Sequence, residues 1–192
     1  MRKAILVVVL GILAWIFVVP GCSAEFGCAA TIASAYADDR SCPSSIQVAA
    51  GSPDWAAARM ETIKDKKLTT GLFYDEDGNE ESFTSGEKDD AARQANDVLD
   101  DVGIPREPRA KRHAVAAHVE VKVAAQMREA RVRYGVLVIN NPSGICQGVG
   151  GGTGCQDVLR AVLPVGAILA VWTPLEIQAG RHEAVMFVGI AP

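Results

Sequence analysis

The residues whose types and spacing best suit chemistry are His118, Glu120, Cys146 and Cys155. Zinc is bound by imidazole nitrogen and thiolate sulfur, and three protein ligands leave a fourth position open for water. We therefore expect His118, Cys146 and Cys155 to hold a catalytic zinc ion. Zinc lowers the pKa of bound water toward neutrality, so hydroxide becomes available to attack an amidine-like ring carbon. Glu120 would move the proton from the water to the ring nitrogen and the departing ammonia without binding the metal.

The spacing of His118 and Glu120 restricts where the pair can lie. Residues two apart inside a helix point to different faces, so the pair is expected at the start of the helix predicted over residues 114–131. The apolar stripe of that helix takes every fourth residue from Val119 to Met127. His118 can then face a metal while Glu120 reaches the water bound to it.

The two cysteines are separated by eight glycine-rich residues, Gln147 to Gly154. Glycine allows such a segment to fold into an excursion that returns both sulfurs to one metal. Cys155 also stands at the predicted start of a helix over residues 155–163, where the positive end of the helix dipole favours a thiolate. The alternative for the pair is a disulfide bond, which export from the cell would favour.

The elements around these residues alternate between strand and helix patterns, which is typical of a sheet covered by helices. We predict an α/β fold with a mixed sheet of about five strands that begins with an antiparallel hairpin. The predicted strands cover residues 68–74, 80–85, 135–139, 167–173 and 183–190, and the predicted helices cover 54–65, 88–102, 114–131 and 155–163.

The first residues are typical of an export segment. A basic start, Met1 to Lys3, precedes sixteen uninterrupted apolar residues, Ala4 to Val19. Secretion after cleavage of a signal peptide, a lipid anchor at Cys22 and an uncleaved membrane helix are all compatible with this segment. We expect Cys28 and Cys42 to be able to form a disulfide bond in an exported protein. The expected organisation is a signal peptide or membrane anchor over residues 1–24, a flexible linker over 25–53, and the domain with the candidate site over 54–192.

Charge is unevenly distributed along a chain whose net charge is only −4. From Asp54 to Glu107 there are 7 basic and 15 acidic residues, whereas from Pro108 to Pro192 there are 9 basic and 5 acidic residues. A basic C-terminal part suits a polyanionic partner, DNA or RNA. Arg109, Lys111 and Arg112 precede the helix that begins near His118 and could bind phosphates in a groove leading to the site. The alternative is a solvated loop.

With their surroundings, these residues resemble the cytidine-deaminase superfamily and, within it, the bacterial deaminase-toxin domains of the DddA-like kind. The resemblance spans roughly residues 68 to 190. It rests on Ser85-Gly86 at the end of the hairpin, Ala117-His118-Val119-Glu120 followed by an alanine-rich helix with Met127, Val138-Ile139-Asn140-Asn141-Pro142, the two cysteines, and Leu163-Pro164-Val165-Gly166.

The resemblance implies a cytidine-deaminase-like fold, conversion of cytosine to uracil in nucleic acid, delivery as a toxin between bacteria, and a dedicated immunity protein as partner. By matching position, it gives the zinc-ligand roles to His118, Cys146 and Cys155 and the proton-shuttle role to Glu120. It also places Asn140 and Asn141 beside the pocket as substrate-binding candidates, and Ser85 joins them from the hairpin.

One departure from the superfamily concerns the cysteines. The usual pattern is Pro-Cys-x-x-Cys, whereas here eight residues lie between Cys146 and Cys155 and no proline immediately precedes Cys146.

The sequence is also compatible with two functions other than deamination of nucleic acid. One is a secreted or membrane-tethered binding protein without catalysis, with Cys146 and Cys155 in a disulfide bond, and the other is a deaminase of free nucleosides.

Overall fold

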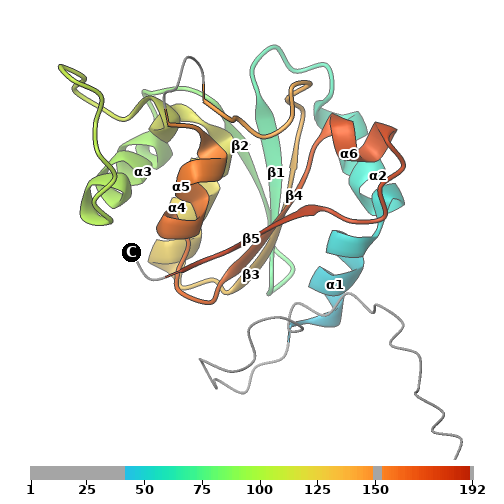
Figure 1. Cartoon of the computed structure of the whole chain (residues 1–192). Helices are drawn as coiled ribbons and strands as arrows, with labels where there is room; N and C mark the ends of the chain where they lie inside the picture. The colour runs from blue at the N-terminus through green and yellow to red at the C-terminus, as the bar shows by residue number, and fades with distance from the viewer. Residues whose placement is uncertain (1–41, 149–152, 191–192) are drawn as a thin grey trace, which may run out of the picture.

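Five strands form one mixed sheet in the computed structural model of the chain, which describes residues 42–148 and 153–190 (Figure 1). The strand order is β2-β1-β3-β4-β5. β1 pairs antiparallel with both β2 and β3, whereas β4 pairs parallel with β3 and antiparallel with β5. The predicted α/β fold with an antiparallel hairpin at its start is therefore confirmed. The strands are β1 (Thr70–Asp75), β2 (Glu80–Thr84), β3 (Tyr134–Ile139), β4 (Ile168–Trp172) and β5 (Val185–Val188).

The central strands are buried on both faces. Every residue of β3 (YGVLVI) and of β4 (ILAVW) is buried, and neither strand alternates apolar with polar residues. Such continuous apolar strands need a layer of helices on each side. The edge strand β2 (EESFT) differs, because it buries only Phe83.

Two layers of helices supply this cover (Figure 1). α3, α4 and α5 lie on one face of the sheet, and α1 and α2 lie on the other, so the sheet separates two apolar cores. Trp172 is fully buried in the second core and donates its indole N–H to the carbonyl oxygen of Ala49 at 2.9 Å. The helices are α1 (Ser44–Gly51), α2 (Pro53–Ile63), α3 (Asp90–Asp101), the 3-10 helix η1 (Ala114–Ala117), α4 (Val119–Ala130), α5 (Cys155–Val162) and α6 (Pro174–Gln178).

The flexible linker expected over residues 25–53 is wrong for its last part. Residues 44–51 form helix α1, which buries Ile46, Ala49 and Ala50 against the sheet. The buried residues of this short helix are one isoleucine and two alanines, so its sequence has almost no periodic pattern of large apolar residues. Its composition is therefore similar to that of a linker. The folded domain therefore begins before residue 54. Segment 1–24 and residues 25–41 lie outside the described residues.

Two further observations concern the expected export of the chain. Cys42 is buried and disulfide-bonded, and Cys28, its expected partner, lies outside the described residues. Within residues 42–148 and 153–190, no helix combines the length and the apolarity needed to cross a bilayer.

The parallel pair of strands determines where a site can form. β3 and β4 are parallel and are connected through α5, so their carboxyl ends meet at one edge of the sheet. Ligand sites in α/β sheets form beyond the carboxyl ends of such strands. The segment from Asn140 to Gly148 follows β3 at this edge, and Thr173 follows β4.

Candidate metal centre and active site

His118 lies between two helices that differ in type. The helix expected over residues 114–131 is interrupted there, because η1 ends at Ala117 and α4 begins at Val119. His118 has an extended backbone (φ −86°, ψ 143°), and Glu120 lies in the first turn of α4. Both residues are therefore at the start of a helix, as their spacing predicts. Val119, Val123 and Met127 are fully buried and hold this turn against the sheet.

Cys155 is the first residue of α5 and is completely buried. The backbone N–H of Gly154, the residue before the helix, donates to the Asp157 carboxylate at 2.8 Å. This bond satisfies one of the donors that a helix start leaves open and fixes the direction in which the Cys155 side chain enters the interior.

The residues after Cys146 return to pack against the start of α5. The backbone N–H of Gln156 donates to the Cys146 carbonyl oxygen at 3.2 Å. A Cβ atom on Gly154 would lie 2.4 Å from backbone atoms of Gln147 and Gly148, so only glycine permits this approach. The glycine-rich insertion thus brings Cys146 beside Cys155, as predicted, although residues 149–152 of it lie outside the described residues.

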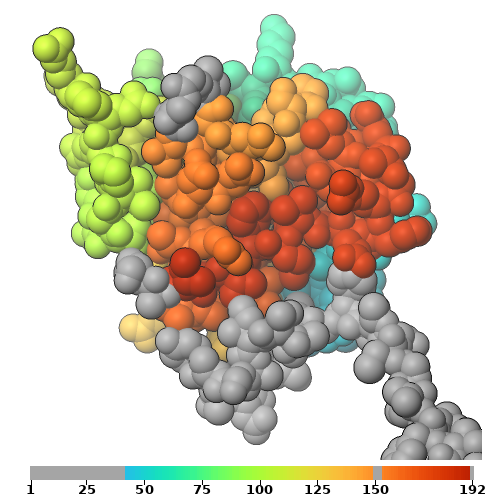
Figure 2. Space-filling view, in the orientation of Figure 1, coloured from blue at the N-terminus to red at the C-terminus, as the bar shows by residue number. Residues whose placement is uncertain are grey.

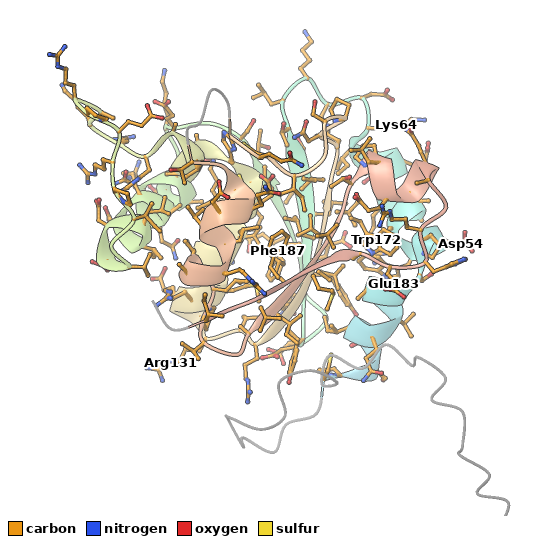
Figure 3. All side chains as sticks on the ribbon, in the orientation of Figure 1. Asp54, Lys64, Arg131, Trp172, Glu183 and Phe187 are labelled. Carbon is orange, nitrogen blue, oxygen red and sulfur yellow. The ribbon has the colours of Figure 1, made fainter. Side chains whose placement is uncertain are left out.

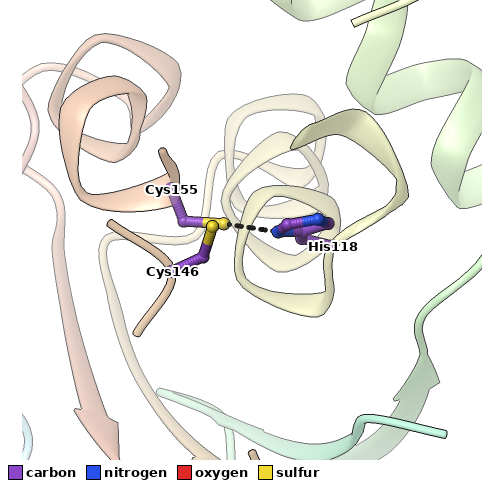
Figure 4. A group of neighbouring side chains, drawn as sticks. All are labelled: His118, Cys146 and Cys155. Atoms are coloured by element: carbon purple, nitrogen blue, oxygen red, sulfur yellow. Dashed lines mark hydrogen bonds between the residues drawn. The ribbon is translucent and has the colours of Figure 1, made fainter. Parts of the chain in front are cut away.

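The three expected ligands form one cluster (Figure 4). Their donor atoms all lie within 4.8 Å of one another, and His118 Nδ1 lies 3.1 Å from Cys155 Sγ. Ligand atoms around a tetrahedral zinc ion are separated by roughly 3.3 to 3.8 Å, so the cluster fits this metal with small adjustments. Cys146 and Cys155 are both free thiols, which contradicts the alternative in which they form a disulfide bond.

Burial is the main influence on the pKa of the Cys155 thiol. Desolvation raises its pKa well above the usual range, and the neighbouring Glu120 carboxylate and Cys146 raise it further. These effects all favour the neutral thiol of Cys155 over its thiolate. A bound divalent cation reverses the balance, because a coordinating thiol is deprotonated. The environment of Cys155 therefore suits a metal ligand better than a reactive free thiol.

Glu120 is placed next to the cluster without belonging to it. Its side chain is 2 % exposed, and its Oε1 is the acceptor for the Cys146 backbone N–H at 3.5 Å. Glu120, His118 and Cys146 all line the same pocket. A buried carboxylate at the wall of a pocket, beside candidate ligands, can exchange protons with a molecule held there.

The pocket has a volume of about 490 Å³, which is in the range of small-molecule sites. Of the expected substrate-binding residues, Ser85 and Asn141 line it. The Asn141 side chain donates to the carbonyl oxygen of Gly144 and accepts from the backbone N–H of Ser143, so it also fixes the segment that precedes Cys146. The pocket is lined by Thr69, Ser85, His118, Val119, Glu120, Asn141, Ser143, Gly144, Ile145, Cys146, Gln147 and Gly148.

Asn140 does not line this pocket. Its side-chain oxygen accepts from the backbone N–H of Thr70 at 2.7 Å, and its amide nitrogen donates to the carbonyl oxygens of Ile63 and Lys66 at 2.8 and 3.3 Å. Both ends of the side chain are thus used to connect β1, β3 and the end of α2. Sequence alone does not distinguish such a structural amide from one that faces a ligand.

The basic side chains of the expected loop do not form part of the pocket wall. Arg109, Lys111 and Arg112 are exposed and line none of its wall. Arg112 donates to the carbonyl oxygen of Glu87 at 2.8 Å. The segment between α3 and η1 projects from the body of the molecule (yellow-green, upper left in Figure 2). Arg112 is thus held two residues away from Ser85 of the pocket wall, and the phosphate-binding role of the three basic residues stays a prediction.

Lys122 supports the pocket and is not among the predicted site residues. Its side chain is fully buried, and its Nζ donates to the Thr84 carbonyl oxygen at 2.7 Å and to the Asp89 carboxylate at 2.6 Å. These bonds tie the start of α4 to the residue before Ser85. A lysine within the apolar run Val121 to Ala125 was the available signal.

Replacing Lys122 by Met should lower the free energy of unfolding by about 2 kcal/mol, because hydrogen bonds to a charged group are lost. Denaturant unfolding followed by circular dichroism measures this change. The matched replacement of the exposed Lys88 by Met is the control and should have little effect. Equal stability of the Lys122 and Lys88 variants would contradict the supporting role.

Comparison with known protein families identifies the family of this chain. A family model described as SCP1.201-like deaminase matches residues 45–184. No curated protein matches the chain. The matched region includes α1 except for its first residue, the strands β1 to β4 and every residue of the candidate metal centre, and it ends at the residue before β5. The chain belongs to the SCP1.201-like deaminase family.

Proposed function

We propose that this protein is a zinc-dependent deaminase that converts cytosine to uracil in nucleic acid. The observation that supports this most is the cluster of His118, Cys146 and Cys155 donor atoms beside the buried Glu120, in a chain of a deaminase family. In the reaction water adds to the ring carbon, and the exocyclic amino group leaves as ammonia.

Each residue has a separate task in this proposal. His118, Cys146 and Cys155 hold the zinc ion, which when bound lowers the pKa of a water toward neutrality and favours its attack on the base. Glu120 accepts one proton from the attacking water and passes it to the ring nitrogen, and it then carries the remaining proton of the added hydroxyl to the amino group, which leaves as ammonia. Asn141 holds the segment leading to Cys146, and Ser85 lies where it can contact the substrate.

The biological setting is part of the same proposal. The resemblance to DddA-like domains and the apolar run from Ala4 to Val19 support an exported toxin that acts between bacteria. Such a toxin requires an immunity protein in the cell that makes it. Secretion or a membrane anchor would deliver it out of that cell.

A substrate screen tests the proposed reaction. Zinc-loaded protein is incubated with free cytidine and with single- and double-stranded DNA and RNA, and the products are sequenced or analysed for uracil. We expect C-to-U conversion in at least one polymer. Conversion of cytidine alone would favour a deaminase of free nucleosides, and absence of conversion in every substrate would contradict the proposed activity.

Removing the metal should lower the melting temperature by about 10 °C, because a ligand present at about 1,000 times its dissociation constant stabilises the folded state by about 4 kcal/mol. Scanning calorimetry before and after treatment with a chelator measures the change, and added zinc should restore it. The variant Cys146→Ser, which lacks one ligand, should respond little to the chelator. If the chelator leaves the melting temperature of the unmodified protein unchanged, the proposed zinc site is contradicted.

A further inference from the structure

A second pocket lies directly beside the active-site pocket. It has a volume of about 610 Å³, and Thr69 lines both pockets. It is formed where the end of α2 and the segment leading to β1 meet α6 and the residues after β3. The pocket and the candidate metal centre thus lie at the same edge of the sheet, beyond the carboxyl ends of β3 and β4.

The chemistry of this pocket is basic on one side and apolar on the other. Lys64, Lys66 and Lys67 line it, together with a single acidic residue, Glu61. Lys64 lies 2.7 Å from Glu61 and is neutralised by it, whereas Lys66 and Lys67 form no ion pair with any described residue. The apolar wall includes Leu68, Pro142, Pro174 and Ile177, and Leu68 is 58 % exposed.

The backbone that presents these lysines is held in place. Asn140 donates to the carbonyl oxygens of Ile63 and Lys66, and the Lys66 backbone N–H donates to Ile63 at 3.0 Å. Asn140 precedes Asn141 of the active-site pocket, so the two pockets share one support. Such a fixed arrangement reduces the entropy lost when a ligand binds.

These three lysines follow one another closely in a part of the sequence that is otherwise acidic. They lie in the half of the chain in which acidic residues outnumber basic ones by 15 to 7. Lys64 and Arg131, at the end of α4, lie on opposite sides of the view (upper right and lower left in Figure 3). Two unpaired cations beside an exposed apolar wall match a nucleotide, which combines a phosphate with a flat ring that stacks on apolar groups.

We propose that this second pocket binds the nucleotide adjacent to the target cytidine, with Lys66 and Lys67 on the intervening phosphate and Leu68 and Ile177 against the neighbouring base. This inference rests on the proposed function, because it assigns a polymer as the substrate. It replaces the expected phosphate-binding role of Arg109, Lys111 and Arg112 with a surface that adjoins the active site. A pocket for the neighbouring base would also give the enzyme a preference for sequence context.

Binding of a labelled oligonucleotide tests the phosphate contacts without requiring catalysis. The zinc-loaded variant Glu120→Gln is titrated with a fluorescent single strand containing one cytidine, at several salt concentrations. Adding Lys66→Glu and Lys67→Glu should weaken binding at least tenfold and reduce the salt slope by about 0.7, since both lysines contact one phosphate and each phosphate contact on a single strand contributes about 0.7.

A control with the same change in charge is Arg131→Glu with Arg160→Glu. These exposed residues lie at the ends of α4 and α5 opposite His118 and Cys155, so the control should weaken binding much less. Equal weakening by the two pairs, unchanged binding after reversal of the lysines, or absence of any binding would overturn the inference.

The neighbouring base is tested in the active enzyme. An oligonucleotide with an abasic position next to the cytidine should have a kcat/KM about tenfold lower than the intact strand, because stacking of one base contributes about 1 to 3 kcal/mol. Ile177→Ala should largely remove this difference. An unmodified protein that binds the strand through the lysines but deaminates nothing would contradict the proposed function and leave the binding surface supported. If the rate of deamination is unchanged both by the lysine replacements and by the abasic position, only the proposed role of the second pocket is contradicted.

Discussion

Replacing Glu120 by Gln should lower the rate of deamination by about 10²- to 10⁴-fold while the protein retains its zinc. The amide has the size of the carboxylate and can still accept the Cys146 backbone N–H, so the cluster of ligands should keep its geometry. It cannot accept the proton of the attacking water. The expected result is therefore a loss of kcat with unchanged metal content, measured by uracil formation and by elemental analysis of the same sample.

Glu129→Gln is the matched control for this prediction. Glu129 is exposed near the end of the same helix, far from the pocket, so its replacement should leave the rate and the metal content unchanged. Full activity of the Glu120 variant would contradict the proton-transfer role. Loss of zinc from it would instead assign Glu120 to the metal site.

Replacing Gly154 by Ala should weaken zinc binding by about 10- to 100-fold, the effect typical of changes in the residues that orient metal ligands. The added Cβ would lie 2.4 Å from backbone atoms of Gln147 and Gly148 and 2.8 Å from the Cys146 carbonyl oxygen. Backbone atoms cannot rotate away as a side chain can, so Cys146 must move away from Cys155. Competition with a chromophoric chelator measures the affinity.

Gly51→Ala is the control for the change from glycine to alanine. No heavy atom lies within 4 Å of the Cβ that it would add, so it should leave zinc affinity unchanged. If Gly154→Ala binds zinc as tightly as the unmodified protein, the approach of the two backbone segments is not required for the metal centre.

The sequence was sufficient to predict the parts of the fold that have a clear local pattern of apolar or turn residues. The buried strands β3 and β4 are continuous apolar runs, and the hairpin of β1 and β2 surrounds a turn with Asp75 and Gly78. Helix α1 was missed because its buried residues are mostly alanine, and its contacts are with strands far away in sequence. Such tertiary contacts have no local signal.

The candidate site was predicted in part for a similar reason. The types and spacing of His118, Glu120 and Cys155 were sufficient to predict these residues and their positions at helix starts, whereas the return of Cys146 depends on the close approach at Gly154. The resemblance placed Asn140 beside the pocket, but the sequence could not show that its amide bonds to the backbone of Thr70, Ile63 and Lys66. The bond of Arg112 to the carbonyl oxygen of Glu87 is likewise a tertiary contact without a local sequence signal.

X-ray absorption at the zinc K-edge tests the metal centre most directly. Purified protein that contains one equivalent of zinc should give a first shell of two sulfur atoms at about 2.3 Å and two nitrogen or oxygen atoms at about 2.0 to 2.1 Å. The sulfur atoms would be those of Cys146 and Cys155, so Cys146→Ser should remove one of them. A protein that binds no zinc, or a shell without sulfur, would contradict the metal centre formed by His118, Cys146 and Cys155.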